Sequence, residues 1–151
     1  MKIAQTHYLF WLDAGCAIKD SLKAVRVLLK IYGFYSPNSS TSISALTYPT
    51  VIKDFLPERF IHIAKSRMLS GGIVGVNLWD FSAVQIIREW YQLTSDLSLL
   101  APEGSNRENH RQDQSLLSLV YYSRKKCLPL LQRRYYEFMV HLNKGKWNRH
   151  R

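Results

Sequence analysis

Residues 101–119 read A-P-E-G-S-N-R-E-N-H-R-Q-D-Q-S-L-L-S-L, a dense polar segment that runs directly into an apolar pattern. Most side chains in its first fourteen positions can ionise or hydrogen-bond, among them Glu103, Asn106, Arg107, Asn109, His110, Arg111, Asp113 and Gln114. The apolar residues that follow predict a helix from about residue 112 to residue 123, which anchors the polar loop. The cluster is a candidate for binding a polyhydroxylated or phosphorylated ligand. The alternative is a polar loop whose side chains hydrogen-bond only within the loop.

The N-terminal third of the chain predicts a strand, a helix and a loop. Residues 8–12 (Y-L-F-W-L) are apolar and aromatic, which is typical of a buried strand. A helix with apolar positions at helical spacing follows, capped by Asp20 or Ser21 and ended by Gly33. Residues 36–44 are rich in Pro, Asn, Ser and Thr and almost uncharged, so they predict a loop.

The middle of the chain repeats this alternation. Residues 71–78 (G-G-I-V-G-V-N-L) are β-branched and glycine-rich, which predicts a strand closely approached by other backbone or by a ligand. Asp80 or Ser82 caps the next predicted helix. The adjacent aromatic residues Trp90 and Tyr91 lie on its apolar stripe, where core packing is favoured over sugar stacking.

Length and element order predict the fold class. The 151 residues, 46% of them hydrophobic, suit a modest core, and no apolar run is long enough to cross a membrane. Alternating strands and helices predict an α/β layered fold, with a small mixed sheet flanked by helices. A last helix is predicted from Pro129 to about Leu142. We therefore expect a domain over residues 1–128 and a basic helical tail over residues 129–151.

Positive charge is concentrated at the C-terminal end. From Arg124 onward nine Lys or Arg residues face one acid, Glu137, so this end carries eight of the ten net positive charges. A small basic module that binds nucleic acid or an acidic surface is therefore an alternative function. Nucleic acid is the less favoured partner because no recognised binding motif accompanies the charge. A solvated amphipathic helix explains the same residues without a partner.

Three sequence pieces occur in a characteristic order: W-L-D-A-G at residues 11–15, S-G-G-I-V-G-V-N at residues 70–77, and N-H-R-Q-D-Q-S at residues 109–115. Together they resemble the nucleotide-sugar-dependent glycosyltransferases of the GT-A fold, in particular branches that read P-E-G-S-x-R-x-N-H-R-x-D-Q. The resemblance covers roughly residues 8–122. It implies a partial GT-A layered fold, of the nucleotide-diphospho-sugar transferase type. It also implies transfer of a sugar from a nucleotide-sugar donor to a glycan or other hydroxyl acceptor.

The resemblance implies donor-binding roles at the two strands. Asp13 matches the first Asp of the D-x-D motif, which holds the ribose of the donor and a divalent metal, Mn²⁺ or Mg²⁺. Gly15 stands where the family has the second Asp, so this chain departs from the metal-binding pattern. Gly71 and Gly72 resemble the glycines that line the donor-sugar pocket. Close packing against a helix is their alternative role.

The third piece implies the residues nearest the chemistry. Asp113 resembles the carboxylate that faces the transferred sugar and the acceptor. It would act as general base in an inverting enzyme and would orient the sugar in a retaining one. Gln114 would bind hydroxyl groups, and His110 and Arg111 would bind the diphosphate. The alternatives are a favourable interaction of Asp113 with the helix dipole, and capping or salt-bridge roles for His110 and Arg111.

GT-A domains usually begin with a nucleotide-binding half that precedes the D-x-D strand. The resemblance therefore predicts that this chain is the C-terminal portion of such a domain, truncated and weak or inactive alone. An incomplete sheet would expose an edge through which the chain could associate with a partner. A non-catalytic interaction domain is a further alternative. The N-terminal residues lack the long apolar region and the small-residue cleavage site of a secretory signal, so we expect the chain as given in the cytoplasm, although an upstream part could carry a membrane anchor.

Overall fold

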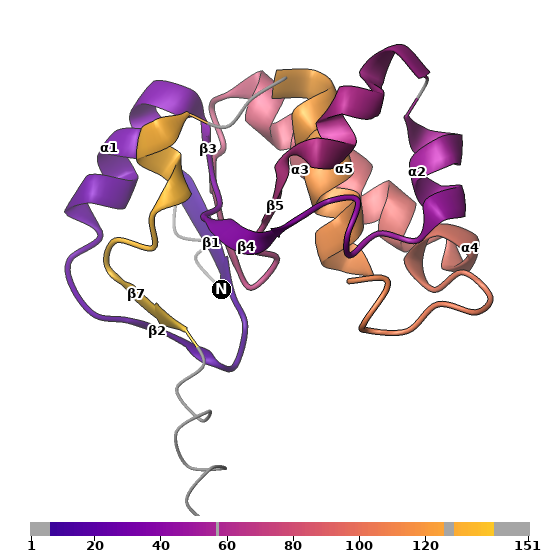
Figure 1. The fold of residues 1–151 in the computed structure, drawn as a ribbon. Helices are drawn as coiled ribbons and strands as arrows, with labels where there is room; N and C mark the ends of the chain where they lie inside the picture. The colour runs from indigo at the N-terminus through magenta and orange to yellow at the C-terminus, as the bar shows by residue number, and fades with distance from the viewer. Residues whose placement is uncertain (1–6, 57, 126–128, 141–151) are drawn as a thin grey trace, which may run out of the picture.

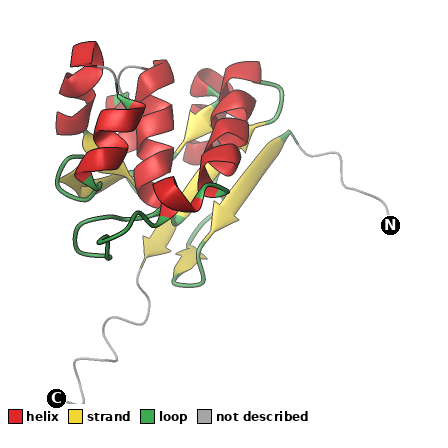
Figure 2. Ribbon diagram, turned by 90° about the vertical axis from the view of Figure 1, so that its right-hand side faces the viewer, coloured by secondary structure: helices red, strands yellow, loops and turns green. Residues whose placement is uncertain are grey.

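The structure, a computed structural model, describes residues 7–56, 58–125 and 129–140. Over these residues the chain forms an α/β fold with small antiparallel sheets and five α-helices (Figures 1 and 2). Two 3₁₀ helices, η1 and η2, complete it. The elements are β1 (Tyr8–Leu12), β2 (Cys16–Ile18), α1 (Lys23–Tyr32), β3 (Phe34–Tyr35), β4 (Asn38–Ser42), α2 (Pro49–Phe55), η1 (Glu58–Lys65), β5 (Arg67–Leu69), β6 (Ile73–Asn77), α3 (Phe81–Thr94), α4 (Leu97–Leu100), α5 (Asp113–Lys125), η2 (Leu130–Arg133) and β7 (Phe138–Val140).

The central sheet has the strand order β1–β6–β3, with β1 at one edge. Two further strand pairs, β2–β7 and β4–β5, lie apart from it. Each of these pairings among the described residues is antiparallel. The predicted α/β class is therefore confirmed, and the predicted mixed sheet is wrong. No long crossover helix joins parallel neighbours in this sheet, because β6 runs antiparallel to both strands beside it.

The central sheet separates two hydrophobic cores, because successive side chains of a strand point to opposite faces. Val74 and Val76 of β6 join the larger core, which α2, α3, α5 and η1 complete. Ile73 of β6 joins the smaller core, built with α1 and with Phe138 of β7. In Figure 1, α1 and β2–β7 accordingly lie on one side of β1 and β3, and α2, α3 and α5 lie on the other.

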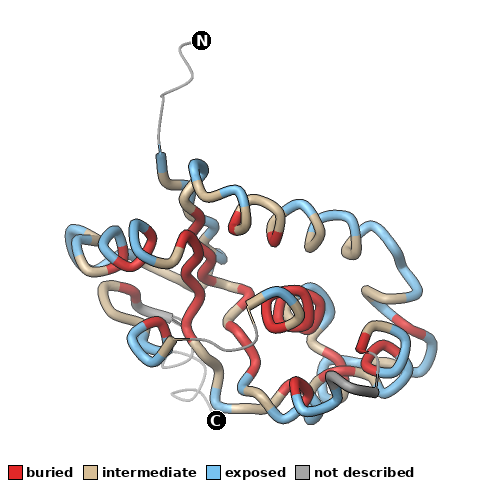
Figure 3. Tube along the Cα trace, turned by 90° about the horizontal axis from the view of Figure 1, so that it is seen from above, coloured by how far each residue is buried: buried red, intermediate tan, exposed pale blue. Residues whose placement is uncertain are grey.

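Helix α5 runs through the larger core. Its eight consecutive residues 115–122 are all buried, so the helix is covered around its whole circumference (Figure 3). A helix surrounded in this way must satisfy its hydroxyl groups internally. Ser118 does so by donating to the main-chain oxygen of Gln114 and accepting from the amide of Leu69. The predicted helix at residues 112–123 is confirmed, and the fold fixes its first residues relative to β5.

Local signals identified two of the helix ends correctly. Gly33 ends α1 in the left-handed conformation (φ 75°), and its amide donates to the Leu29 oxygen. Asp80 caps α3 by accepting a hydrogen bond from the Ala83 amide. The predicted cap of α1 is wrong, since neither Asp20 nor Ser21 accepts from the first turn of that helix.

The cap of α1 comes from the far end of the chain. Glu137 Oε1 accepts a hydrogen bond of 2.9 Å from the amide of Ala24. The carboxylate thus occupies the positive end of the helix, where an anion is favoured. The isolated acid of the basic C-terminal stretch is therefore a structural residue of α1.

Two further predictions are corrected. Residues 38–42 form β4, paired irregularly with β5, although their composition predicted a loop. The predicted helix after Pro129 is replaced by η2 and β7. Gln132 of η2 is buried and donates to the Phe34 oxygen, and β7 pairs with β2. Residues 129–140 therefore belong to the main fold, and residues 141–151 of the predicted tail lie outside the described part.

Candidate functional site

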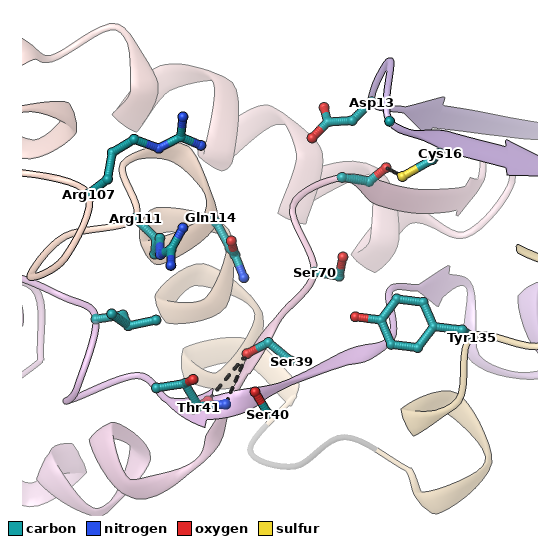
Figure 4. Close-up of a pocket in the computed structure, with 13 residues that line it drawn as sticks. Asp13, Cys16, Ser39, Ser40, Thr41, Ser70, Arg107, Arg111, Gln114 and Tyr135 are labelled. Atoms are coloured by element: carbon teal, nitrogen blue, oxygen red, sulfur yellow. Dashed lines mark hydrogen bonds between the residues drawn. The ribbon is translucent and has the colours of Figure 1, made fainter. Parts of the chain in front are cut away.

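A polar cleft of about 380 Å³ lies where the end of β1, strand β4 and the head of α5 meet (Figure 4). Its walls come from segments far apart in the sequence. The cleft is lined by Asp13, Gly15, Cys16, Ser39, Ser40, Thr41, Leu46, Ser70, Gly72, Arg107, Arg111, Gln114 and Tyr135. Four residues that the sequence predicted for the site, Asp13, Gly72, Arg111 and Gln114, are thus brought together. Gly71, His110 and Asp113 are not among the lining residues.

Asp13 and Gly72 form one corner of the cleft. Leu12 pairs with Ile73 at the end of β1, so Asp13 follows directly beside the start of β6. The Asp13 amide donates to the Gly72 oxygen at 3.0 Å. A Cβ atom at Gly72 would stand 2.8 Å from Asp13 Oδ2. Glycine at position 72 therefore leaves the room that the exposed carboxylate of Asp13 occupies.

Gly71 has a different role from its neighbour. A Cβ atom there would lie 3.1 Å from Gln114 Cβ and 3.3 Å from Gln114 Cα, which belong to the first turn of α5. Gly71 is buried and lets the chain before β6 approach this helix closely. The structure thus gives Gly71 the packing role that was its alternative.

Arg107 and Arg111 stand on the wall opposite Asp13 (Figure 4). The loop that carries them is held by its own asparagines: Asn109 Oδ1 accepts from the Asn106 amide, and Asn106 Oδ1 accepts from the Glu108 amide. The amide of Arg111 also donates to the Leu46 oxygen at 3.0 Å. Within the described part of the chain, neither guanidinium group forms a hydrogen bond or an ion pair. Two cations without a bound carboxylate in one polar cleft can bind an anion such as a phosphate.

Gln114 is held in place by β5. Its side-chain nitrogen donates one of its two hydrogens to the Leu69 oxygen at 2.6 Å. The predicted binding of ligand hydroxyl groups is left to the second N–H of that nitrogen and to the oxygen atom, which accepts. Gln114 is therefore both a packing residue of the α5–β5 contact and part of the cleft wall.

Asp113 is the exposed first residue of α5 and lines a second, apolar groove, whereas the next residue, Gln114, lines the cleft. Partial desolvation raises the pKa of its carboxyl group, and the nearby charge of Asp13 raises it further. A hydrogen bond from the amide of Gln114 and the charge of Arg107 act in the opposite direction. The carboxylate of Asp113 is therefore a stronger base than an ordinary aspartate and is electrostatically coupled to both walls of the cleft.

His110 is buried away from the cleft. Its Nδ1 atom accepts from the Tyr48 amide at 3.2 Å, and its Nε2 atom lies 3.0 Å from the Leu99 oxygen. An Nδ1 atom that accepts must be unprotonated, so Nε2 carries the hydrogen and the ring is neutral. Burial lowers its pKa accordingly. The prediction that His110 binds a diphosphate is wrong, because both ring nitrogens hold main-chain groups together.

Several residues of the cleft had no recognised signal in the sequence. Ser39, Ser40 and Thr41 of β4 form its floor, with Ser39 Oγ within hydrogen-bond distance of the Thr41 amide and oxygen (Figure 4). Tyr135, from the predicted tail, stands on the side of Ser70. Their hydroxyl groups add donors and acceptors to a cleft that already has charges of both signs.

Cys16 also lines the cleft. Its thiol donates to the Gly72 oxygen at 3.5 Å. Burial raises the pKa of this thiol, and the charge of Asp13 raises it further, so the thiol stays protonated near neutral pH. Cys16 is therefore a wall residue and a poor nucleophile.

The described residues offer few grouped side chains that could bind a metal ion. Over the described residues, no three His, Cys, Asp or Glu side chains are grouped so that they could hold a metal. Mn²⁺ and Mg²⁺ need several oxygen ligands, and Gly15 brings no side-chain oxygen beside Asp13. The residues present do not fit a metal held by protein side chains alone, and we assign none to the cleft.

Comparison of the chain with protein-family models, with curated proteins and with solved structures found no match. The geometry and charge of the cleft are therefore the basis for assigning a function. Within residues 7–56, 58–125 and 129–140, no helix has the length and apolar character needed to cross a membrane.

Proposed function

We propose that the cleft binds the diphosphate of a nucleotide-sugar and that the chain is a glycosyltransferase-like domain of GT-A type. One observation carries this proposal. Arg107 and Arg111, neither paired with a described carboxylate, face Asp13 across a polar cleft, and Asp113 adjoins it. The two cations suit the phosphates, whereas the carboxylate of Asp13 and the hydroxyl groups of the cleft suit ribose or sugar hydroxyl groups.

The same arrangement supports a transfer reaction. In an inverting transfer, Asp113 takes the proton of the acceptor hydroxyl while the acceptor oxygen bonds to the anomeric carbon of the sugar. The bond between that carbon and the phosphate oxygen breaks, and the departing nucleoside diphosphate carries the electron pair and the negative charge. Arg107 and Arg111 stabilise that charge. In a retaining transfer, Asp113 orients the sugar instead.

The alternative of a basic binding module has less support. Much of its charge lies in residues 141–151, outside the described part of the chain, and residues 129–140 are integrated in the fold. That alternative stays a prediction from the sequence.

Binding of free nucleotides tests the proposal. The purified chain is titrated with UDP and with GDP by isothermal calorimetry, first in EDTA and then with Mn²⁺. One nucleotide should bind, and Arg111→Ala should weaken its binding by roughly 10- to 100-fold, as expected for the loss of a charge-assisted contact. Arg26→Ala is the matched control, because Arg26 is an exposed arginine of α1 that does not line the cleft.

Two outcomes would count against the proposal. A folded chain that binds neither nucleotide, with or without Mn²⁺, would show that the cleft is not a donor site by itself. Equal weakening by Arg26→Ala and Arg111→Ala would show that the binding is a general effect of positive charge.

The Mn²⁺ titration also tests the metal assignment. If the nucleotide binds only with Mn²⁺, its own phosphate oxygens must complete a metal site, and our assignment of no metal would be withdrawn.

A further inference from the structure

A second hollow, of about 410 Å³, has Asp113 in its lining, and the next residue along α5, Gln114, lines the cleft. This hollow lies between α3 and the face of the central sheet that α1 does not cover. We call it the apolar groove. Its principal walls are Leu9, Trp11, Val74, Val76, Trp90 and Tyr91.

The groove exists because α3 covers β6 and leaves β1 uncovered. Leu9 and Trp11 alternate along β1 with residues that pack into the smaller core, so they point to the opposite face. They stay 53% and 59% exposed, and Tyr91 on the facing helix is 73% exposed. A cluster of large apolar side chains left open to water is typical of a binding surface.

The groove has few polar groups, which limits what it can bind. Apart from Asp113, only Thr94 and Tyr91 contribute polar side-chain atoms other than the indole nitrogens to the lining. The indole of Trp90 already donates to the main-chain oxygen of Asp113 at 2.8 Å, which fixes the ring beside that residue. A sugar with many hydroxyl groups would gain few hydrogen bonds from this lining. A molecule with a carboxylate or phosphate would meet the negative charge of Asp113.

An apolar, flat body with a single hydroxyl group fits these limits. Indole rings stand on both walls, Trp11 from β1 and Trp90 from α3, and aromatic side chains pack well against flat rings. The volume is within the range of pockets for small organic molecules. The carboxylate of Asp113 can accept a hydrogen bond from the hydroxyl group.

We propose that the apolar groove binds the aromatic body of the acceptor. We further propose that the Asp113 carboxylate accepts a hydrogen bond from the hydroxyl group of this acceptor, beside the cleft. The acceptor role rests on the proposed function, because a transferred sugar must come from a donor bound in the cleft. The acceptor class that follows is a neutral aromatic alcohol or phenol.

Direct binding of model compounds tests the inference. The chain is titrated by calorimetry with 2-naphthol, with 2-naphthoate and with 1-octanol, none of which carries a nucleotide. We expect 2-naphthol to bind in roughly the submillimolar range, as usual for a ligand of this size. We expect 2-naphthoate to bind at least about tenfold more weakly, and Asp113→Asn to close that gap. We expect 1-octanol, which has a flexible chain in place of the flat ring, to bind more weakly than 2-naphthol.

Substitutions of groove residues test whether 2-naphthol binds in the apolar groove. Trp11→Ser should weaken 2-naphthol binding by about five- to tenfold, as expected for one aromatic contact. Trp79→Ser is the matched control, because Trp79 is 75% exposed and does not line the groove. Tyr91→Ser serves as a second test should Trp11→Ser fail to fold, which a thermal melt would show.

The inference is overturned if Trp11→Ser and Tyr91→Ser leave 2-naphthol binding unchanged. It is also overturned if 2-naphthoate binds as tightly as 2-naphthol, or if 1-octanol binds more tightly than 2-naphthol. The nucleotide titration separates this failure from failure of the proposed function. Nucleotide binding that depends on Arg111, without naphthol binding, refutes the groove alone. Naphthol binding without nucleotide binding refutes the donor cleft and, with it, the acceptor role.

Discussion

Replacing His110 tests whether the imidazole stabilises the fold or contacts a ligand. His110→Ala removes the partner of the Tyr48 amide and the partner of the Leu99 oxygen, at a position with no solvent exposure. Each main-chain group left without a partner costs about 1–3 kcal/mol. The lost ring also leaves a cavity, so we expect the free energy of unfolding to fall by about 3–5 kcal/mol. That loss is a large share of the about 5–15 kcal/mol typical of a domain.

The pH dependence gives an independent readout of the same residue. Burial holds the pKa of His110 below its ordinary value of 6.5. As the pH falls through that value, the unfolded chain binds a proton that the folded chain does not. Stability is therefore full above about pH 6.5 and decreases below it, at a rate of at most about 1.4 kcal/mol per pH unit for one proton. Urea unfolding followed by circular dichroism at several pH values measures both effects.

Two conservative variants serve as controls. His110→Asn keeps an acceptor near the position of Nδ1, and His110→Gln keeps a donor near that of Nε2. Each should lose less stability than His110→Ala, and neither should show the histidine-dependent loss below pH 6.5. The reasoning is refuted if His110→Ala unfolds at the same urea concentration as the parent. It is equally refuted if His110→Gln keeps its stability and loses nucleotide binding.

Three further predictions concern the cleft and the long-range cap. Gly72→Ala should shift the Asp13 carboxylate and alter nucleotide affinity with little loss of thermal stability, since the added methyl closely approaches the exposed side chain of Asp13 and no buried side chain. Glu137→Ala should lower the free energy of unfolding by about 1–2 kcal/mol in a urea titration, because the Ala24 amide loses its cap. Asp113→Asn should be more stable than the parent in thermal melts near neutral pH. That difference should disappear below the ordinary aspartate pKa of 3.8, because the raised pKa penalises only the ionised form.

Features set by short stretches of sequence were predictable. Gly33 ends α1 because a left-handed residue is needed there, and Asp80 caps α3 through a bond to a residue three positions away. Both interactions are complete within a few residues, so local chemistry determines them. The apolar period that predicted α5 is also local, although its burial on every side depends on the rest of the fold.

Features set by distant pairing were not predictable. The Ser- and Thr-rich residues 38–42 form a strand because β5 pairs with them from about thirty residues away. The C-terminal residues 138–140 pair with β2 near the start of the chain, which overrides their helical pattern. The alternation of strands with helices predicted the α/β class without fixing which strands would be neighbours.

The candidate site shows the same division. The sequence placed Asp13 at a strand end and Gln114 at a helix head, and the fold brings both to one cleft. It could not show that His110 points inward, because this depends on the approach of Tyr48 from 62 residues earlier. A polar cluster at a helix start thus predicted one segment that lines the cleft, whereas the division between cleft-lining and buried side chains required the fold.

The charges around Asp113 imply a coupling between donor binding and base strength. In the structure the charge of Arg107 lowers the pKa of Asp113, and the charge of Asp13 raises it. On the proposed function, a diphosphate paired with Arg107 would neutralise the lowering charge and bring additional negative charge to the cleft. Both effects raise the pKa of Asp113 further, so its carboxylate becomes a stronger base when donor is bound. The arrangement would thus favour proton removal from an acceptor only when a sugar is present to receive its oxygen.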